Sequence, residues 1–274
     1  MLALVLSSWA EKPLKSESGP AANCASTDAG GLPADLGQIV YRTAAPAGRR
    51  IYIIANGHRS ALSGANAAAT VQAQLETFRI GEWLIRQRQV GLLLPEGFFG
   101  RMVETAAVSN AGLDSGSLRS ALEDRSQFVN AELLLHNNYG ICLEQVEDRE
   151  LYRSTKETLR VSRGQEIASA LKSRLQLGAL QTRRTAAILQ SAPRVVDTAY
   201  RQGRISTPNA MLTLGLAHLN DIVTFLKAGA IRFGPLHTAY RDFPAEESGL
   251  ELLKREVGVT VIVPRSLVAF LSQN

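Results

Sequence analysis

Three polar side chains stand directly after apolar runs, at the positions where buried strands would end. His58 closes the run IYIIANGH, Glu96 closes LLLPE, and His218 closes LGLAH. The carboxyl ends of parallel strands lie at one edge of a sheet, and open α/β sheets bind their ligands at that edge. We therefore expect these three side chains to share one polar site.

Two further carboxylates belong with this set, because Glu144 ends the apolar run ICLE and Glu147 follows it closely. Histidine and carboxylate side chains together suit zinc, manganese or iron. The candidate ligands of a divalent metal ion are therefore His58, Glu96, Glu144, Glu147 and His218. Without a metal, His58, Glu96 and His218 are candidate catalytic residues, with a histidine as general base and a carboxylate that orients it.

Each of these residues also has a plain structural interpretation. A single histidine after a strand is most often a hydrogen-bonded loop residue, and Glu147 also suits the first turn of a helix, where an acidic side chain complements the helix dipole. Gly57 and Gly215, near the two histidines, would allow a ligand to approach the backbone closely. The other histidines, His136 and His237, are expected to be structural or exposed.

Alternating strand and helix patterns predict the elements that would hold these residues. Strands are expected at residues 38–42, 50–54, 91–94, 141–145, 211–215, 230–233 and 257–263, and helices at residues 71–90, 117–138, 149–204, 220–228 and 246–256. The first two strands are expected to form a hairpin, and Pro193 is expected to split or kink the long helical segment. The alternation predicts an α/β fold with a mostly parallel central sheet, flanking helices and a helical insertion.

The chain divides into a short leading segment and one domain. Residues 1–36 are rich in Ser, Gly, Pro and Ala and are expected to be disordered. Residues 37–274 are expected to form a single α/β domain, with the helical insertion at about residues 149–205. The start MLALVLSSWA is either the remnant of a secretory signal, which would place the protein in the periplasm or outside the cell, or an ordinary unstructured start. No apolar run reaches the ~20 residues that a membrane helix needs.

The composition is that of a globular chain that can bury a sizeable core. Of 274 residues, 45% are hydrophobic and 20% charged. The net charge of +5 permits nucleic-acid binding, but the sequence has no zinc-finger spacing and no basic run with interleaved aromatics, which argues against it. Cys24 and Cys142 are the only cysteines, so a disulfide framework is not expected. The expected partner is a small-molecule or peptide substrate.

Four motifs, taken in their order, resemble the TraB/Tiki superfamily, which includes haem-binding ChaN-like proteins and the erythromycin-esterase group. They are IYIIANGH, LLLPEG, FVNAELLLHNNYGICLEQVEDRELY and LTLGLAHLNDIVTFLKAG. The resemblance implies an α/β core and two GxxH motifs with glutamates between them. Gly215 to His218 matches the second motif in full, whereas the first has Ala55 where a glycine is expected. Glu96 matches the glutamate after the second strand, and Glu144 or Glu147 matches a later one.

The resemblance implies several activities, because members of this superfamily differ in their chemistry. Proteolytic members imply metal-dependent hydrolysis, in which the metal ion polarises a carbonyl and activates water. We therefore expect a metal-dependent hydrolase that acts on a peptide or ester bond. A non-catalytic protein that binds haem or another ligand, and a metal-free enzyme of the esterase type, remain as alternatives. Ala55 favours a member whose site has lost its activity.

Overall fold

The computed structural model describes residues 31–44, 48–57, 67–102, 114–124, 129–162, 167–238 and 240–273. Its central sheet contains β1 (Gly37–Arg42), β2 (Arg50–Asn56), β3 (Leu92–Pro95), β4 (Arg101–Met102), β5 (Cys142–Glu144), β6 (Ala210–Gly215) and β11 (Gly258–Pro264). Their order is β1-β11-β2-β6-β3-β5-β4. The five strands from β11 to β5 run parallel, and β1 and β4 are antiparallel edges. The predicted α/β fold with a mostly parallel sheet is confirmed.

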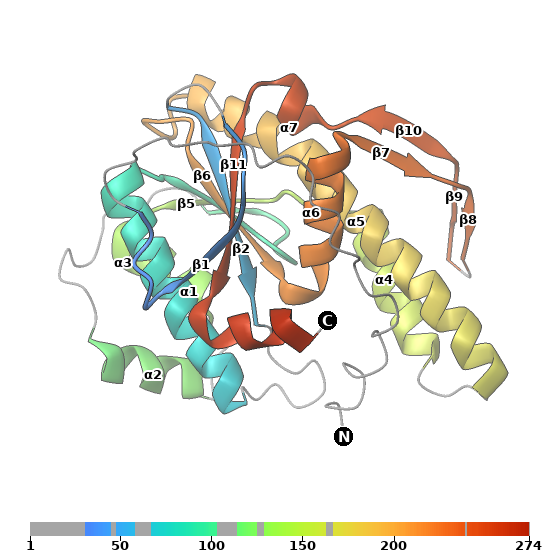
Figure 1. Ribbon diagram of the computed structural model, residues 1–274, viewed down its shortest axis with the longest axis horizontal. Coiled ribbons are helices and arrows are strands. Elements are labelled where there is room, and N and C mark those ends of the chain that lie inside the picture. Colours follow the sequence, from blue (N-terminus) through green and yellow to red (C-terminus); the bar gives the residue numbers. More distant parts are fainter. Residues whose placement is uncertain are drawn as a thin grey trace.

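Helices cover both faces of this sheet (Figure 1). One face packs against α1 (Ala68–Arg88), α2 (Ser115–Glu123) and α3 (Ala131–Tyr139), and the other against α5 (Ile167–Arg201), α6 (Leu219–Ala228) and α7 (Glu251–Lys254). Helix α4 (Arg149–Ser162) pairs with α5, and the short 3-10 helices η1 (Leu216–His218) and η2 (Arg265–Gln273) follow β6 and β11. None of the described helices is both long enough and apolar enough to cross a membrane.

The central strands are apolar on both sides because both sides are covered. In β2, Ile51 and Ile53 belong to the core under α5 and α6, whereas Tyr52 and Ile54 belong to the core under α1 and α3. Successive side chains of a strand point to opposite faces, so a continuous apolar run marks a strand buried on both. The same pattern fixes which face each polar residue at the strand end will join.

The predicted hairpin of the first two strands is wrong. Strand β1 pairs antiparallel with β11, and β2 pairs parallel with the other side of β11. All seven residues of β11 are buried, so this strand needs a neighbour on each side. The last strand of the chain therefore inserts between the first two, which local sequence patterns do not reveal.

Three predicted helices also differ from the structure. Residues 117–138 form two helices, and α3 begins where Asn130 accepts a 2.9 Å hydrogen bond from the backbone N–H of Leu133. The long helical segment contains two described helices, α4 and α5, and Pro193 lies inside α5. Residues 246–256 contain β10 (Glu246–Gly249) before α7.

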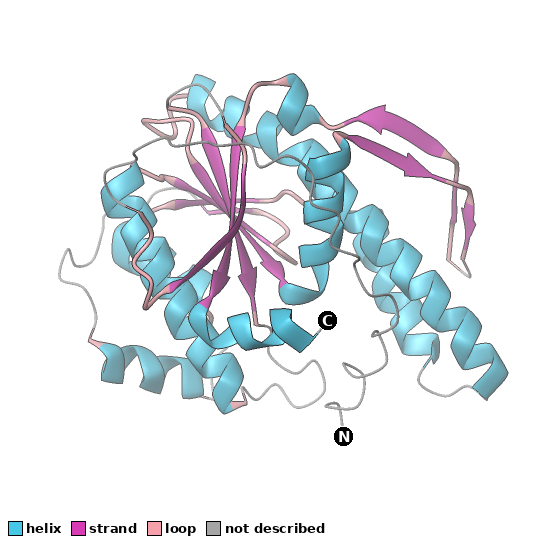
Figure 2. Ribbon diagram, viewed as in Figure 1, coloured by secondary structure: helices cyan, strands magenta, loops and turns pink. Residues whose placement is uncertain are grey.

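Four short strands form an arm outside the central sheet. Strand β10 pairs with β7 (Ala230–Phe233), and β8 (Leu236–His237) pairs with β9 (Asp242–Phe243). Figure 2 shows these magenta strands extending away from the sheet, beside α5. The predicted strand at residues 230–233 thus exists, but it belongs to a separate two-stranded sheet.

Candidate active site

The candidate active site lies where β3 and β6 end, on the face covered by α5 and α6. Glu96 follows β3, and its backbone N–H donates to the carbonyl of Thr213 in β6 at 3.0 Å. Strand β6 ends at Gly215, whose N–H donates to Glu96 Oε2 at 2.7 Å. The chain then turns through η1 and brings His218 to the start of α6, where the residue is 0% exposed.

Glu96 and His218 face each other inside this site. Nε2 of His218 lies 3.3 Å from Glu96 Oε1, and Nδ1 lies 2.6 Å from the hydroxyl of Thr185. That hydroxyl has a single proton, which goes either to the carbonyl of Gln181 at 3.0 Å or to the carboxylate of Asp221, so it accepts a hydrogen bond from Nδ1–H. We therefore assign the ring proton of neutral His218 to Nδ1. Its Nε2 then accepts from the Gln181 side-chain amide at 2.9 Å.

One proton has to lie between His218 and Glu96 for their contact to be attractive. With a proton at Nδ1 alone, Nε2 presents a lone pair, and an ionised carboxylate would repel it. A proton placed between the two atoms would make the contact attractive, and it would take over the single lone pair of Nε2 from the Gln181 amide. The 3.3 Å separation therefore allows a proton to pass between Glu96 Oε1 and His218 Nε2.

Arg184 joins this pair to a second carboxylate. Its Nη2 lies 3.1 Å from Glu96 Oε1, and its guanidinium group donates twice to Glu147 Oε1, from Nε at 3.1 Å and from Nη2. Glu147 also accepts from the backbone N–H of Gly97 at 3.2 Å. Burial raises the pKa of the Glu147 carboxyl group, the charge of Glu96 adds to the increase, and Arg184 opposes it.

Asp221 stands behind the histidine on α6. Burial raises the pKa of its carboxyl group, while hydrogen bonds from Thr182 and Thr185 and the nearby ring of His218 act in the opposite direction. Since Thr185 contacts both Asp221 and His218, a polar chain runs from Asp221 to Glu96. All its members lie on η1, α5, α6 or the end of β3.

The structure brings together three of the five predicted site residues. Glu96, Glu147 and His218 meet around Arg184. Glu144 lies apart, because on β5, next to the edge strand β4, it forms ion pairs with Arg101 at 2.7 Å and with Arg204. His58 lies outside the described residues.

The remaining histidines stand where they were expected. The buried ring of His136 makes a 2.7 Å hydrogen bond with the carbonyl of Ile141, which ties α3 to the start of β5. His237 is exposed and lies 3.1 Å from Asp242.

Four residues of the site were missed in the sequence. Arg184, Thr185 and Gln181 come from α5, and Asp221 comes from α6. Arg184 is only 7% exposed, although it lies in a polar helical segment. A signal did exist. The buried residues Leu180 and Ile188 lie four positions before and after Arg184, so all three share one helical stripe.

The described donors do not by themselves fit a metal ion. Among the described residues, no group of three or more His, Cys, Asp or Glu side chains could hold one. The oxygen of Glu96 that faces His218 also faces the guanidinium group of Arg184, and a second cation there would be repelled. Haem fits no better, since His218 is fully buried and both of its ring nitrogens are engaged. Because His58 lies outside the described residues, the metal site stays a prediction.

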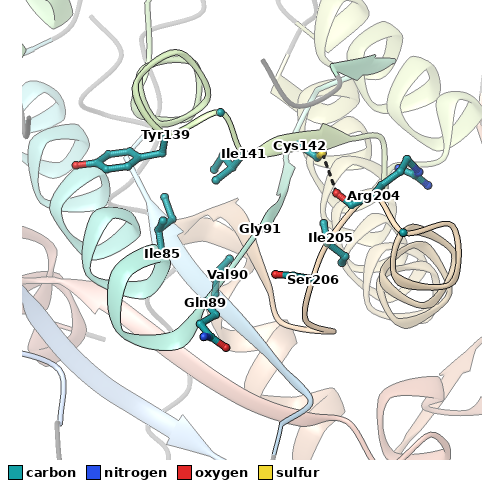
Figure 3. Close-up of a pocket in the computed structure, with 12 residues that line it drawn as sticks. Ile85, Gln89, Val90, Gly91, Tyr139, Ile141, Cys142, Arg204, Ile205 and Ser206 are labelled. Carbon is teal, nitrogen blue, oxygen red and sulfur yellow. Dashed lines mark hydrogen bonds between the residues drawn. The ribbon is translucent and has the colours of Figure 1, made fainter. Parts of the chain in front are cut away.

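A cavity of about 460 Å³ opens at the opposite edge of the sheet (Figure 3). It lies at the amino ends of β3, β5 and β6, between the last turns of α1, α3 and α5. Cys142 and Arg204 line it, and the thiol of Cys142 contacts the carbonyl of Arg204 at 3.6 Å. None of the four predicted site residues that the structure describes lines this cavity.

Comparison with known proteins adds no family assignment to this geometry. The resemblance to the TraB/Tiki superfamily therefore stays a prediction that depends on the four motifs. No protein-family model, no curated protein and no solved structure matches this chain.

Proposed function

We propose that this protein is a hydrolase that cleaves an ester or peptide bond, with Glu96 and His218 as its acid–base pair. One observation carries the proposal. A carboxylate and an imidazole lie 3.3 Å apart at the carboxyl edge of a parallel sheet, with the far side of the imidazole held by Thr185. A histidine with a carboxylate partner is a common arrangement for general acid–base catalysis.

Glu96 is the member of the pair that meets the substrate. Its side chain is 14% exposed, whereas that of His218 is 1% exposed. Glu96 takes a proton from a water molecule as the water attacks the carbonyl carbon, and His218 behind it shares that proton. The proton then returns through Glu96 to the leaving group. Such proton transfers contribute typically about 10²–10⁴-fold to a rate.

The neighbours of Glu96 hold it in place for this role. Its Oε1 faces Arg184 and His218, and its Oε2 accepts from the backbone N–H of Gly215. A base that is already oriented loses little entropy when the substrate arrives. Glu147 forms an ion pair with the same guanidinium group, so the positive charge of Arg184 is shared between Glu147 and Glu96.

The resemblance also implies a divalent metal ion, and no step described here needs one. If His58 completed a ligand set with Glu96 and His218, the ion would supply an activated water at neutral pH. Elemental analysis of the protein purified without chelator, beside assays before and after dialysis against chelator, separates the two mechanisms. The metal-free mechanism predicts full activity after chelation.

Hydrolysis of chromogenic esters and fluorogenic peptides tests the proposal. The wild-type protein is expected to cleave at least one class, and His218→Gln to lower kcat by about 100-fold or more. His237→Gln, which changes an exposed histidine of the arm, is the matched control and is expected to retain wild-type rates. If the wild-type protein cleaves none of these substrates, or His218→Gln keeps the wild-type kcat, the proposed hydrolysis is wrong and a non-catalytic ligand-binding protein is favoured.

A further inference from the structure

A second buried polar cluster lies at the same sheet edge, on the face covered by α1 and α3. Asn56, the last residue of β2, is its centre. The Asn56 side chain donates to Glu132 Oε1 at 3.1 Å and accepts from Gln74 and Thr77, each also at 3.1 Å. The carboxylate of Glu132 is thus fixed through one of its two oxygens.

Two oxygens of this region have no hydrogen-bond partner. They are Glu132 Oε2 and Thr213 Oγ1, which belong to residues that are 5% and 1% exposed. A buried oxygen without a partner costs free energy that the fold has to offset elsewhere, and native structures contain few of them. Each one therefore calls for a specific explanation.

The two oxygens lie on the same face of the sheet. In the parallel pair of β2 and β6, Ile54 is the register partner of Thr213, and Asn56 is the register partner of Gly215. Ile54 belongs to the core under α1 and α3, so Thr213 and Asn56 share that face. The hydrogen bond to Asn56 places Glu132 over that face as well.

No described cation neutralises Glu132. It takes part in none of the ion pairs found among the described residues, although it is a buried carboxylate. The start of α3 favours a negative charge through its dipole, but two of its first N–H groups are used elsewhere. The N–H of Ala131 donates to Gln74, and the N–H of Leu133 donates to Asn130.

We propose that Glu132 and Thr213 bind a small cation with N–H donors, namely a primary ammonium group. A carboxylate oxygen and a hydroxyl oxygen can both accept from such a group, and its charge neutralises the buried carboxylate. A water molecule would satisfy the hydrogen bonds but would leave the charge of Glu132 uncompensated. The ammonium group belongs either to a free small amine or to a larger ligand, such as the amino terminus of a peptide.

Thermal unfolding in matched chloride salts tests this site without any assay of hydrolysis, so its failure is distinct from failure of the proposed function. At equal ionic strength, methylammonium is expected to raise the unfolding midpoint by roughly 2–4 °C over tetramethylammonium, which has the charge but no N–H group. Potassium chloride is expected to match tetramethylammonium. An equal increase with glycinamide hydrochloride supports the amino group of a larger ligand, and an increase with methylammonium alone supports a free amine.

Two variants locate the effect. Glu132→Gln keeps the shape of the side chain and removes the charge, and it is expected to abolish the methylammonium increase. Glu76→Gln is the control, because Glu76 is a buried carboxylate whose two oxygens are already bonded to Gln72 and Ser266. Equal midpoints in methylammonium and tetramethylammonium, an equal increase in potassium, or an increase that persists in Glu132→Gln would each overturn the ammonium site.

Discussion

At the scale of single residues, Arg184 controls the charge balance of the candidate active site. It is the only described cation that forms ion pairs with both Glu96 and Glu147. Two carboxylates that lie close together and have little contact with water repel each other unless a positive charge lies between them. Arg184 is therefore required for the stability of the site as well as for the orientation of Glu96.

Arg184→Gln is expected to destabilise the fold by about 3–5 kcal/mol at neutral pH, because it leaves buried carboxylates uncompensated. Without Arg184, burial and the charge of Glu96 raise the pKa of Glu147 further. An acid whose pKa is raised in the folded state stabilises the fold below its unfolded pKa, and that contribution is lost as the pH rises through the folded pKa. The deficit should therefore be smaller at acidic pH than at neutral pH.

Urea unfolding of the wild type and Arg184→Gln, at acidic and at neutral pH, measures this loss of stability directly. Arg174→Gln, an exposed position of the same helix, is the control and should change stability little. A deficit of the same size at every pH would show that Glu147 does not titrate as its surroundings indicate.

Thr185 sets which nitrogen of His218 carries the proton. Thr185→Val keeps the volume but leaves the buried Nδ1–H without an acceptor, which should cost about 1–3 kcal/mol and lower kcat. Thr185→Ser keeps the hydroxyl group and should retain most of the stability and most of the kcat of the wild type. Parallel measurement of unfolding and kcat in the two variants checks this role, and a Thr185→Val protein with wild-type stability and kcat would exclude it.

The sequence predicted that Glu96 and His218 would lie close together, because both follow apolar runs that indicate buried strands. It did not identify Arg184, because an arginine in a polar helix usually faces solvent, and the helical stripe shared with Leu180 and Ile188 is a weaker signal. Glu144 was assigned to the site by its place after a strand. Its partners Arg101 and Arg204 come from distant segments that the sequence does not relate to one another.

At the scale of elements, the positions of the strands were easier to predict than the order in which the strands pair. Strands β2, β6 and β11 are buried on both faces, so their sequences are continuously apolar. The order of β1, β11 and β2 depends on pairing between the two ends of the domain, which leaves no local signature. Two of the four strands of the arm, β7 and β10, are partly exposed and therefore gave weaker patterns.

The contact between α1 and α3 offers a test at this scale. Gly81 of α1 is buried, and a Cβ atom there would collide with the side chain of Leu135 of α3, which is itself 0% exposed. Alanine favours a helix over glycine by about 1 kcal/mol, but overpacking a core costs about 1–3 kcal/mol. Gly81→Ala is therefore expected to lower the unfolding midpoint.

Leu135→Val should make room for the added methyl group. In a double-mutant cycle, Gly81→Ala is expected to be less harmful in the Leu135→Val background than in the wild type. Additive effects in the cycle, or an increase in stability from Gly81→Ala alone, would contradict the close packing of these helices.

At the scale of the whole molecule, one sheet edge supports two polar clusters on opposite faces. Glu96 donates its backbone N–H to the carbonyl of Thr213, and its carboxylate accepts from Gly215, the register partner of Asn56. The candidate active site uses the ends of β3 and β6, the second cluster uses those of β2 and β6, and the two clusters thus share β6. Parallel pairing makes this possible, since β2, β3 and β6 all end at this edge.

The kcat of Glu96→Gln tests the central claim most directly. The substitution keeps the size of the side chain and removes the base, so kcat should fall by about 10²–10⁴-fold on a substrate that the wild type cleaves. Glu82→Gln is the control, because Glu82 lies on α1 and pairs with Arg79 and Arg86 outside the site. Both variant proteins should be folded and monodisperse. A Glu96→Gln protein with the kcat of the wild type would contradict the role of Glu96 and His218 as the acid–base pair.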